Sequence, residues 1–191
     1  MGRRIRTFIA MAVTPEVRRR AVELQGKLGQ SDANVKWVAE GNIHLTVKFL
    51  GDVDDIALPA VCRAVEQAVA ETPRFVISVA GVGAFPSSHR PRTLWVGVRE
   101  EAERVDRVKR ALDEALFPLG FRDEERRFTP HLTIGRVKGG TSNASGLSER
   151  LAANTDWTGG RSEVGEVVVM SSELRSEGPL YTVMARAKLG G

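Results

Sequence analysis

Apolar and polar residues along this chain follow two periods, and they do so in the same order twice. Runs that favour a β-strand alternate every second residue, and runs that favour a helix carry apolar residues at three- and four-residue spacing. The order strand, helix, strand occurs over residues 6–13, 15–28 and 42–50, and again over 93–98, 101–117 and 128–137. Matched spacing across three consecutive elements indicates an internal duplication.

Each unit continues with a further helix and strand. The first unit adds a helix over 54–70 and a strand over 74–82. The second adds a helix over 147–153 and a strand over 163–171, and a last strand covers 180–189. We therefore predict an α+β, bilobal, duplicated fold with pseudo-two-fold symmetry, in which two antiparallel-rich sheets flank a central cleft and the helices pack outside. The 191 residues are expected to form a single domain of two interleaved lobes.

A His-x-Thr string stands in the second strand of each unit. His44 and His131 are 87 positions apart, and Thr46 and Thr133 follow them at the same spacing. Residues i and i+2 of a strand point to one face, so each histidine shares a face with its threonine. The opposite face is apolar and is expected to pack beneath the helices. The cleft is therefore predicted to hold two imidazoles and two hydroxyls.

This set of groups suits a phosphodiester. Imidazole has an unperturbed pKa of about 6.5 and can act as general acid or base near neutral pH. A hydroxyl can donate to phosphoryl oxygens on which charge develops. A single histidine on a strand is more often structural, but two copies at one position of a duplicated unit favour catalysis. The third histidine, His89, lies in a loop without a duplicate, and a surface role is expected.

The same face predicts no metal or other cofactor. A zinc site needs three or four protein ligands, and neither a cysteine nor a carboxylate shares the duplicated face. Asp52, Asp54 and Asp55 follow the first motif only and are expected to cap the next helix.

The composition bears on the kind of partner and the cellular compartment to expect. The formal charge is +4, with 28 basic and 24 acidic residues, which permits a polyanionic partner without requiring one. The single cysteine, Cys62, excludes an internal disulfide, so a reducing cytoplasm is expected. The N-terminus has a basic start and an apolar run, as a signal peptide does, but the run is short and a first strand is favoured. No apolar stretch approaches the ~20 residues of a membrane span.

The two motifs resemble those of the 2H phosphoesterase superfamily, and within it the RNA 2′,3′-cyclic phosphodiesterases, historically named 2′-5′ RNA ligases. Similar flanking segments extend over nearly the whole chain. The resemblance rests on these residues: Arg6–Ala10, Val35–Val38, Ile43–Gly51, Phe85–Pro86, Arg90–Trp95, Thr129–Arg136, Ser172–Leu174 and Gly178–Tyr181. It implies a bilobal fold, no metal, and hydrolysis of a 2′,3′-cyclic phosphate to a 2′-phosphomonoester.

The resemblance also implies roles by motif position. His44 would donate a proton to the leaving 3′ oxygen, His131 would accept the proton of the attacking water, and Thr46 and Thr133 would hold the phosphoryl oxygens. Arg136 matches the second motif as a phosphate ligand. It stands five residues after His131, which is the wrong face of a regular strand, unless a bulge at Gly135 re-aims it.

Three further side chains are substrate candidates on weaker grounds. Lys48 has the parity of His44 in a regular strand, so we expect it to contact substrate. Phe49, Trp37 and Phe128 could each stack on a base, although core packing is the commoner role of an aromatic residue.

Two alternatives keep the same residues. The reverse reaction would join a cyclic phosphate to a 5′-hydroxyl in a 2′-5′ linkage without ATP, in line with the absence of a Walker-type loop from the sequence. A non-catalytic protein would only bind nucleotides or RNA. In every case we expect the partners to be RNA ends or nucleotides with a 2′,3′-cyclic phosphate, and we expect a monomer without a membrane partner.

Overall fold

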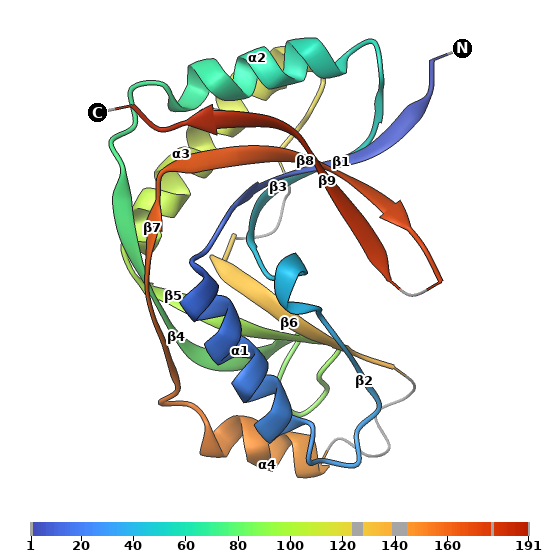
Figure 1. The fold of residues 1–191 in the computed structure, drawn as a ribbon, viewed down its shortest axis with the longest axis vertical. Helices are drawn as coiled ribbons and strands as arrows, with labels where there is room; N and C mark the ends of the chain where they lie inside the picture. Colours follow the sequence, from blue (N-terminus) through green and yellow to red (C-terminus); the bar gives the residue numbers. More distant parts are fainter. Residues whose placement is uncertain (1, 124–127, 139–144, 177, 191) are drawn as a thin grey trace.

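The computed structural model describes residues 2–123, 128–138, 145–176 and 178–190, and these form a mixed α+β fold (Figure 1). In chain order the elements are β1 (Arg4–Met11), α1 (Pro15–Leu28), β2 (Val35–Trp37), the 3₁₀ turn η1 (Glu40–Asn42), β3 (Leu45–Asp54), α2 (Leu58–Val69), β4 (Phe75–Phe85), β5 (Thr93–Glu100), α3 (Ala102–Leu116), the 3₁₀ turn η2 (Phe117–Leu119), β6 (His131–Val137), α4 (Ser145–Ala153), β7 (Thr158–Val164), β8 (Glu166–Leu174) and β9 (Pro179–Lys188).

The described strands form two antiparallel groups joined at one point. The strand order is β7-β4-β5-β6-β3-β1-β8-β9, and β2 pairs with the free part of β6. Between β3 and β6 only Leu45 and Leu132 are paired. The predicted α+β class with antiparallel strands is confirmed, and this single pair makes the two predicted sheets one continuous sheet.

Each half of the sheet is covered by a helix that follows a strand of the other half. Helix α1 leaves β1 but packs against β6 and β7, beside α4, whereas α3 leaves β5 and packs against β3 and α2. Figure 1 accordingly shows α2 and α3 at one end of the molecule and α1 and α4 at the other. The buried Gln25 side chain of α1 fixes the crossing, because its amide donates to the carbonyls of Val38 (2.8 Å) and Ile134 (2.9 Å).

Several predicted boundaries change. Strand β3 does not stop at Gly51 but continues to Asp54, and α2 begins four residues later than predicted, at Leu58. The sequence did not reveal β2, which is only three residues long, or β7, in which two adjacent glycines hide the alternation. None of the helices in the described residues is both long and apolar enough to cross a membrane.

Candidate active site

Strand β6 contains a bulge, which is the condition under which Arg136 shares a face with His131. Along the β5–β6 pairing, Trp95 lies opposite Thr133 but Leu94 lies opposite Gly135, which leaves Ile134 as an extra residue. Ile134 and Gly135 are both buried, and Arg136 is exposed. The extra residue reverses the parity of the strand, so Arg136 lies on the face of His131 and Thr133.

Strand β3 carries the equivalent bulge. Its pairing with β1 skips Val47, so Val47 and Lys48 both face the core and Phe49 returns to the face of Thr46. Phe49 is 57% exposed. Phe49 and Arg136 therefore occupy equivalent positions, each five residues after its histidine.

The same bulge makes the prediction for Lys48 wrong. The Lys48 side chain is almost completely buried, lies 2.5 Å from a carboxylate oxygen of Asp113 and donates to the carbonyl of Arg122. It is thus a buried structural cation that ties β3 to α3, not a substrate contact. A regular strand would place Lys48 on the face of His44, but the bulge at Val47 turns it to the core.

His44 lies in an aromatic enclosure just before β3. Its ring stacks on Phe8 of β1 with centroids 5.0 Å apart, and the Tyr181 ring of β9 meets it edge-on at 5.4 Å. Tyr181 also packs edge-on against Phe8. The side-chain amide of Asn42 donates to the carbonyl of Pro179 (3.1 Å), which ties the start of β9 to the segment that carries His44.

His131 has a similar enclosure at the start of β6. Phe85 meets its ring edge-on with centroids 5.0 Å apart, and Trp95 lies 6.2 Å away. Its Nδ1 lies 2.6 Å from the carbonyl oxygen of Thr129. A carbonyl only accepts hydrogen bonds, so Nδ1 carries the hydrogen and Nε2 is the nitrogen available to the site.

Two observations indicate that the histidines face one space. In an antiparallel ladder, the residue before one member of a pair lies opposite the residue after the other member. The Leu45–Leu132 pair therefore sets His44 towards Thr133 and His131 towards Thr46. In addition, the Arg136 charge acts on both His131 and Tyr181, and Tyr181 contacts His44. Arg136 thus lies within electrostatic range of groups that belong to both halves.

Burial shapes the protonation of these groups. Loss of solvation lowers the pKa of His44 to about 4, against a weaker opposing hydrogen bond with the Asn42 backbone. Burial also lowers the pKa of His131, and the nearby Arg136 charge adds to the effect. Burial raises the pKa of Tyr181. Both imidazoles are therefore neutral near pH 7 in the free protein.

Sequence reasoning missed the aromatic enclosure. Phe8, Phe85, Trp95 and Tyr181 contact the two histidines, but none shares a strand with them. One signal was available, because Phe8 and Trp95 are 87 positions apart, like the histidines. Tyr181 has no such counterpart, and only the curvature of the sheet brings β9 to the site.

The remaining candidates make core contacts. Trp37 packs towards the core over Gly135, and Phe128 packs against the core with the Lys109 ammonium 5.8 Å from its ring. His89 is exposed, as expected. In the described part of the chain, no three His, Cys, Asp or Glu side chains are grouped as ligands for a metal.

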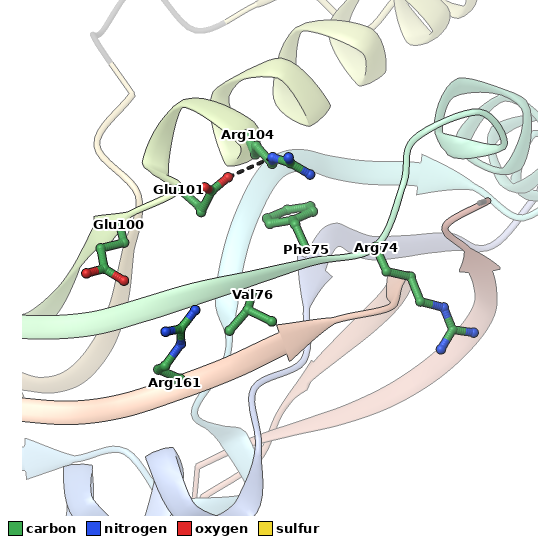
Figure 2. Close-up of a pocket in the computed structure, with 7 residues that line it drawn as sticks. All are labelled: Arg74, Phe75, Val76, Glu100, Glu101, Arg104 and Arg161. Atoms are coloured by element: carbon green, nitrogen blue, oxygen red, sulfur yellow. Dashed lines mark ion pairs between the residues drawn. The ribbon is translucent and has the colours of Figure 1, made fainter.

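A hollow lies away from both motifs, around the start of α3 (Figure 2). An ion pair of 2.7 Å joins Glu101 and Arg104 within one turn at the start of α3, and Arg74 lies 3.7 Å from Glu163. Its lining residues are Arg74, Phe75, Val76, Glu100, Glu101, Arg104 and Arg161. Neither His44 nor His131 is among its lining residues, and its two glutamates offset only part of the charge of its three arginines.

Comparison with known proteins decides the family. Residues 13–175 match the model of the 2′-5′ RNA ligase superfamily. The chain belongs to this superfamily. It is 38% identical to a protein of Methanothermobacter thermautotrophicus named RNA 2′,3′-cyclic phosphodiesterase, over 95% of this chain and 97% of the relative. A Thermotoga maritima protein of the same name is 35% identical, over 98% and 97%.

Solved structures share the fold. TT0787 of Thermus thermophilus superposes with a TM-score of 0.82 at 25% identity, covering 97% of this chain and 98% of the other. Escherichia coli LigT complexed with 3′-AMP superposes with a TM-score of 0.75 at 22% identity, covering 97% and 98%. The family match over residues 13–175 and the two relatives confirm the superfamily membership predicted from the twin motifs.

Proposed function

We propose that this protein hydrolyses 2′,3′-cyclic phosphates at RNA ends or on nucleotides to 2′-phosphomonoesters, with two histidines and no metal. The observation that carries the proposal is the pairing of two His-x-Thr segments on equivalently bulged strands that face one space. Relatives that match at least 95% of the chain and are named RNA 2′,3′-cyclic phosphodiesterase support the substrate class.

In the proposed reaction, water attacks the phosphorus and the bond from phosphorus to the 3′ oxygen breaks. His131 accepts the proton of the water at Nε2, which is free because Nδ1 faces the Thr129 carbonyl. His44 gives a proton to the departing 3′ oxygen. Thr46 and Thr133 donate to the phosphoryl oxygens, and Arg136 offsets the growing negative charge.

The donor role of His44 needs a protonated ring, and burial opposes this in the free protein. An anionic phosphate beside the ring favours the imidazolium form and raises its pKa. We therefore propose that substrate binding itself charges His44. Burial lowers the pKa of both rings, so the division of roles needs a direct test.

A leaving-group comparison provides this test. A p-nitrophenyl nucleotide diester releases a stable anion that needs little protonation, so a variant without the acid should retain turnover on it. We expect His44→Ala to lose about 10²–10⁴-fold on the cyclic phosphate and much less on the nitrophenyl ester. His131→Ala should lose activity on both. The opposite pattern would exchange the two roles.

Phe49 is the proposed base-stacking residue. It is exposed on the histidine face of β3, and its ring lies 6.2 Å from Phe8. A stacked base contributes about 1–3 kcal/mol in single-stranded complexes. Phe49→Ala should therefore raise KM by roughly tenfold or more with little change in kcat.

The central experiment is a product assay on a short RNA with a 2′,3′-cyclic phosphate. We expect a 2′-monophosphate, full activity in excess chelator, and loss of turnover in His44→Ala and His131→Ala with unchanged circular dichroism. Full activity in either variant, or inhibition by chelator, contradicts the proposal. Adding RNA with a 5′-hydroxyl tests for the 2′-5′ joined product, and binding without turnover would indicate a non-catalytic protein.

The proposed setting is the cytoplasm and the proposed state a monomer. Cys62 is an unpaired thiol in the structure, which suits a reducing compartment. Light scattering in size-exclusion chromatography measures the state directly, and a mass near 20.9 kDa is expected. A dimer mass would contradict this part of the proposal.

A further inference from the structure

Lys36 of β2 lies directly opposite Arg136 of β6. The β2–β6 pairing sets Val35 against Val137, Lys36 against Arg136 and Trp37 against Gly135. Val35 and Trp37 pack towards the core, whereas Lys36 and Arg136 are exposed. Opposite residues of an antiparallel pair share a face, so Lys36 lies on the face of the histidines.

Two like charges opposite each other destabilise a strand pair. Within the described ranges, neither Lys36 nor Arg136 lies within 4.0 Å of a carboxylate oxygen, although nine such ion pairs occur elsewhere in those ranges. The hydrogen bond of Arg136 goes to the neutral Thr93 hydroxyl, at 3.4 Å. Among the described residues the pair thus has no carboxylate partner, and an anionic ligand would supply the negative charge.

The two cations point to different parts of the site. Arg136 acts electrostatically on His131 and Tyr181, so it belongs to the space between the histidines. The Lys36 ammonium lies instead beside Gly178, where an added Cβ would be 3.9 Å from Nζ; we call the position at Arg136 inner and the position at Lys36 outer. A ligand with one phosphate can occupy the inner position only, whereas a nucleic acid strand carries a second phosphate to the outer one.

We propose that Lys36 binds the phosphodiester next to the reacting phosphate, so that the protein favours RNA chains over single nucleotides. This inference rests on the proposed function, because it takes the space between the histidines as the position of the cyclic phosphate. An ammonium on a flexible side chain suits a mobile, exposed phosphodiester, while the guanidinium of Arg136 can hold the inner phosphate with two hydrogen bonds.

The test compares a nucleoside 2′,3′-cyclic phosphate with a trinucleotide that ends in the same group. We expect Lys36→Ala to raise KM for the trinucleotide roughly five- to tenfold and to leave kcat/KM for the mononucleotide within about twofold. One lost phosphate contact should also weaken the dependence of log KM on log salt by about 0.7 for a single strand. Lys36→Arg should restore most of the trinucleotide KM.

Lys188→Ala is the matched control, since Lys188 is exposed at the far end of β9, and it should change neither substrate. Equal loss on both substrates would place Lys36 at the reacting phosphate and overturn the proposal, as would no loss on either. Fluorescence anisotropy with labelled RNA ending in a 2′-phosphate keeps the test independent of turnover. Weaker RNA binding by Lys36→Ala in a protein without hydrolysis would support the outer phosphate position while the proposed activity fails.

Discussion

At the scale of single residues, the two motif histidines are alike in sequence but differ in their surroundings. His44 is stacked on Phe8 and covered by Tyr181, whereas His131 lies beside the contacting rings of Phe85 and Trp95 and near the charge of Arg136. Hydrophobic cover lowers the pKa of both rings. Both imidazoles are therefore neutral in the free protein, and a bound anion favours their protonated forms.

The low pKa of His44 predicts a pH-dependent stability. The unfolded ring, with a pKa near 6.5, binds more protons than the folded ring, with a pKa of about 4, so stability rises with pH across this window. The contribution is complete above pH 6.5 and is lost as pH falls towards 4. Between pH 7 and 4.5 we expect His44→Gln to lose about 2 kcal/mol less than the wild type, measured by urea unfolding. His89→Gln, in an exposed loop, should match the wild type, and an unchanged loss in His44→Gln would contradict the argument.

Lys48 gives a second prediction at this scale. Its ammonium is buried against Asp113, which also pairs with Lys109 at 2.5 Å. Lys48→Ala leaves part of a buried network uncompensated, so we expect a loss of about 3 kcal/mol in the free energy of unfolding. Lys48→Met, which fills the space, should lose less. Both variants should keep the wild-type KM while folded; a raised KM with unchanged stability would instead make Lys48 a substrate contact.

At the scale of elements, the bulges of β3 and β6 determine the composition of the site. Each adds one buried residue after the threonine and so returns the fifth residue after the histidine to the histidine face. In β3 that residue is Phe49, and in β6 it is Arg136. The duplication thus gives β3 and β6 the same geometry. At the equivalent position β3 presents an aromatic ring, Phe49, and β6 presents a cation, Arg136.

Gly135 is the residue that tests the β6 bulge. A Cβ there would lie 2.9 Å from the Trp37 ring and 2.9 Å from a Val35 methyl group. We expect Gly135→Ala to destabilise the protein by about 1–3 kcal/mol through overpacking and to raise KM, because β2 and Arg136 must shift. Gly41→Ala, with no atom within 4 Å of the added Cβ, is the control. A Gly135→Ala protein with wild-type stability and KM would show that the close packing is unimportant.

At the scale of the whole molecule, the two halves depend on one another. Helix α1 covers the half that contains β6 and β7, and α3 covers the half that contains β3. Each helix follows a strand of the opposite half, so separating the halves would expose both apolar faces. We therefore expect one cooperative unfolding transition.

The tryptophans make this cooperativity measurable. Trp37, Trp95 and Trp157 all belong to the half that contains β2 and β4–β7, whereas the fully buried Leu112 lies in α3 on the other half. Leu112→Ala should lower stability by about 2–5 kcal/mol. The urea midpoint from tryptophan fluorescence should fall as far as the midpoint from circular dichroism. A fluorescence midpoint that stays at the wild-type value would show that the halves unfold separately.

The sequence by itself determined the duplicated order of elements, the superfamily and the two His-x-Thr strands, because apolar periodicity and a repeated motif are local properties of a chain. It did not determine which side chain after each threonine lies on the histidine face. A bulge depends on how many residues the partner strand sets opposite it, so the pairings with β1 and β5, and not the sequence alone, decide which way Lys48 and Arg136 face. The aromatic cover from β9 and the opposition of Lys36 and Arg136 likewise exist only in the folded sheet, since its curvature and strand register bring together residues more than 90 positions apart.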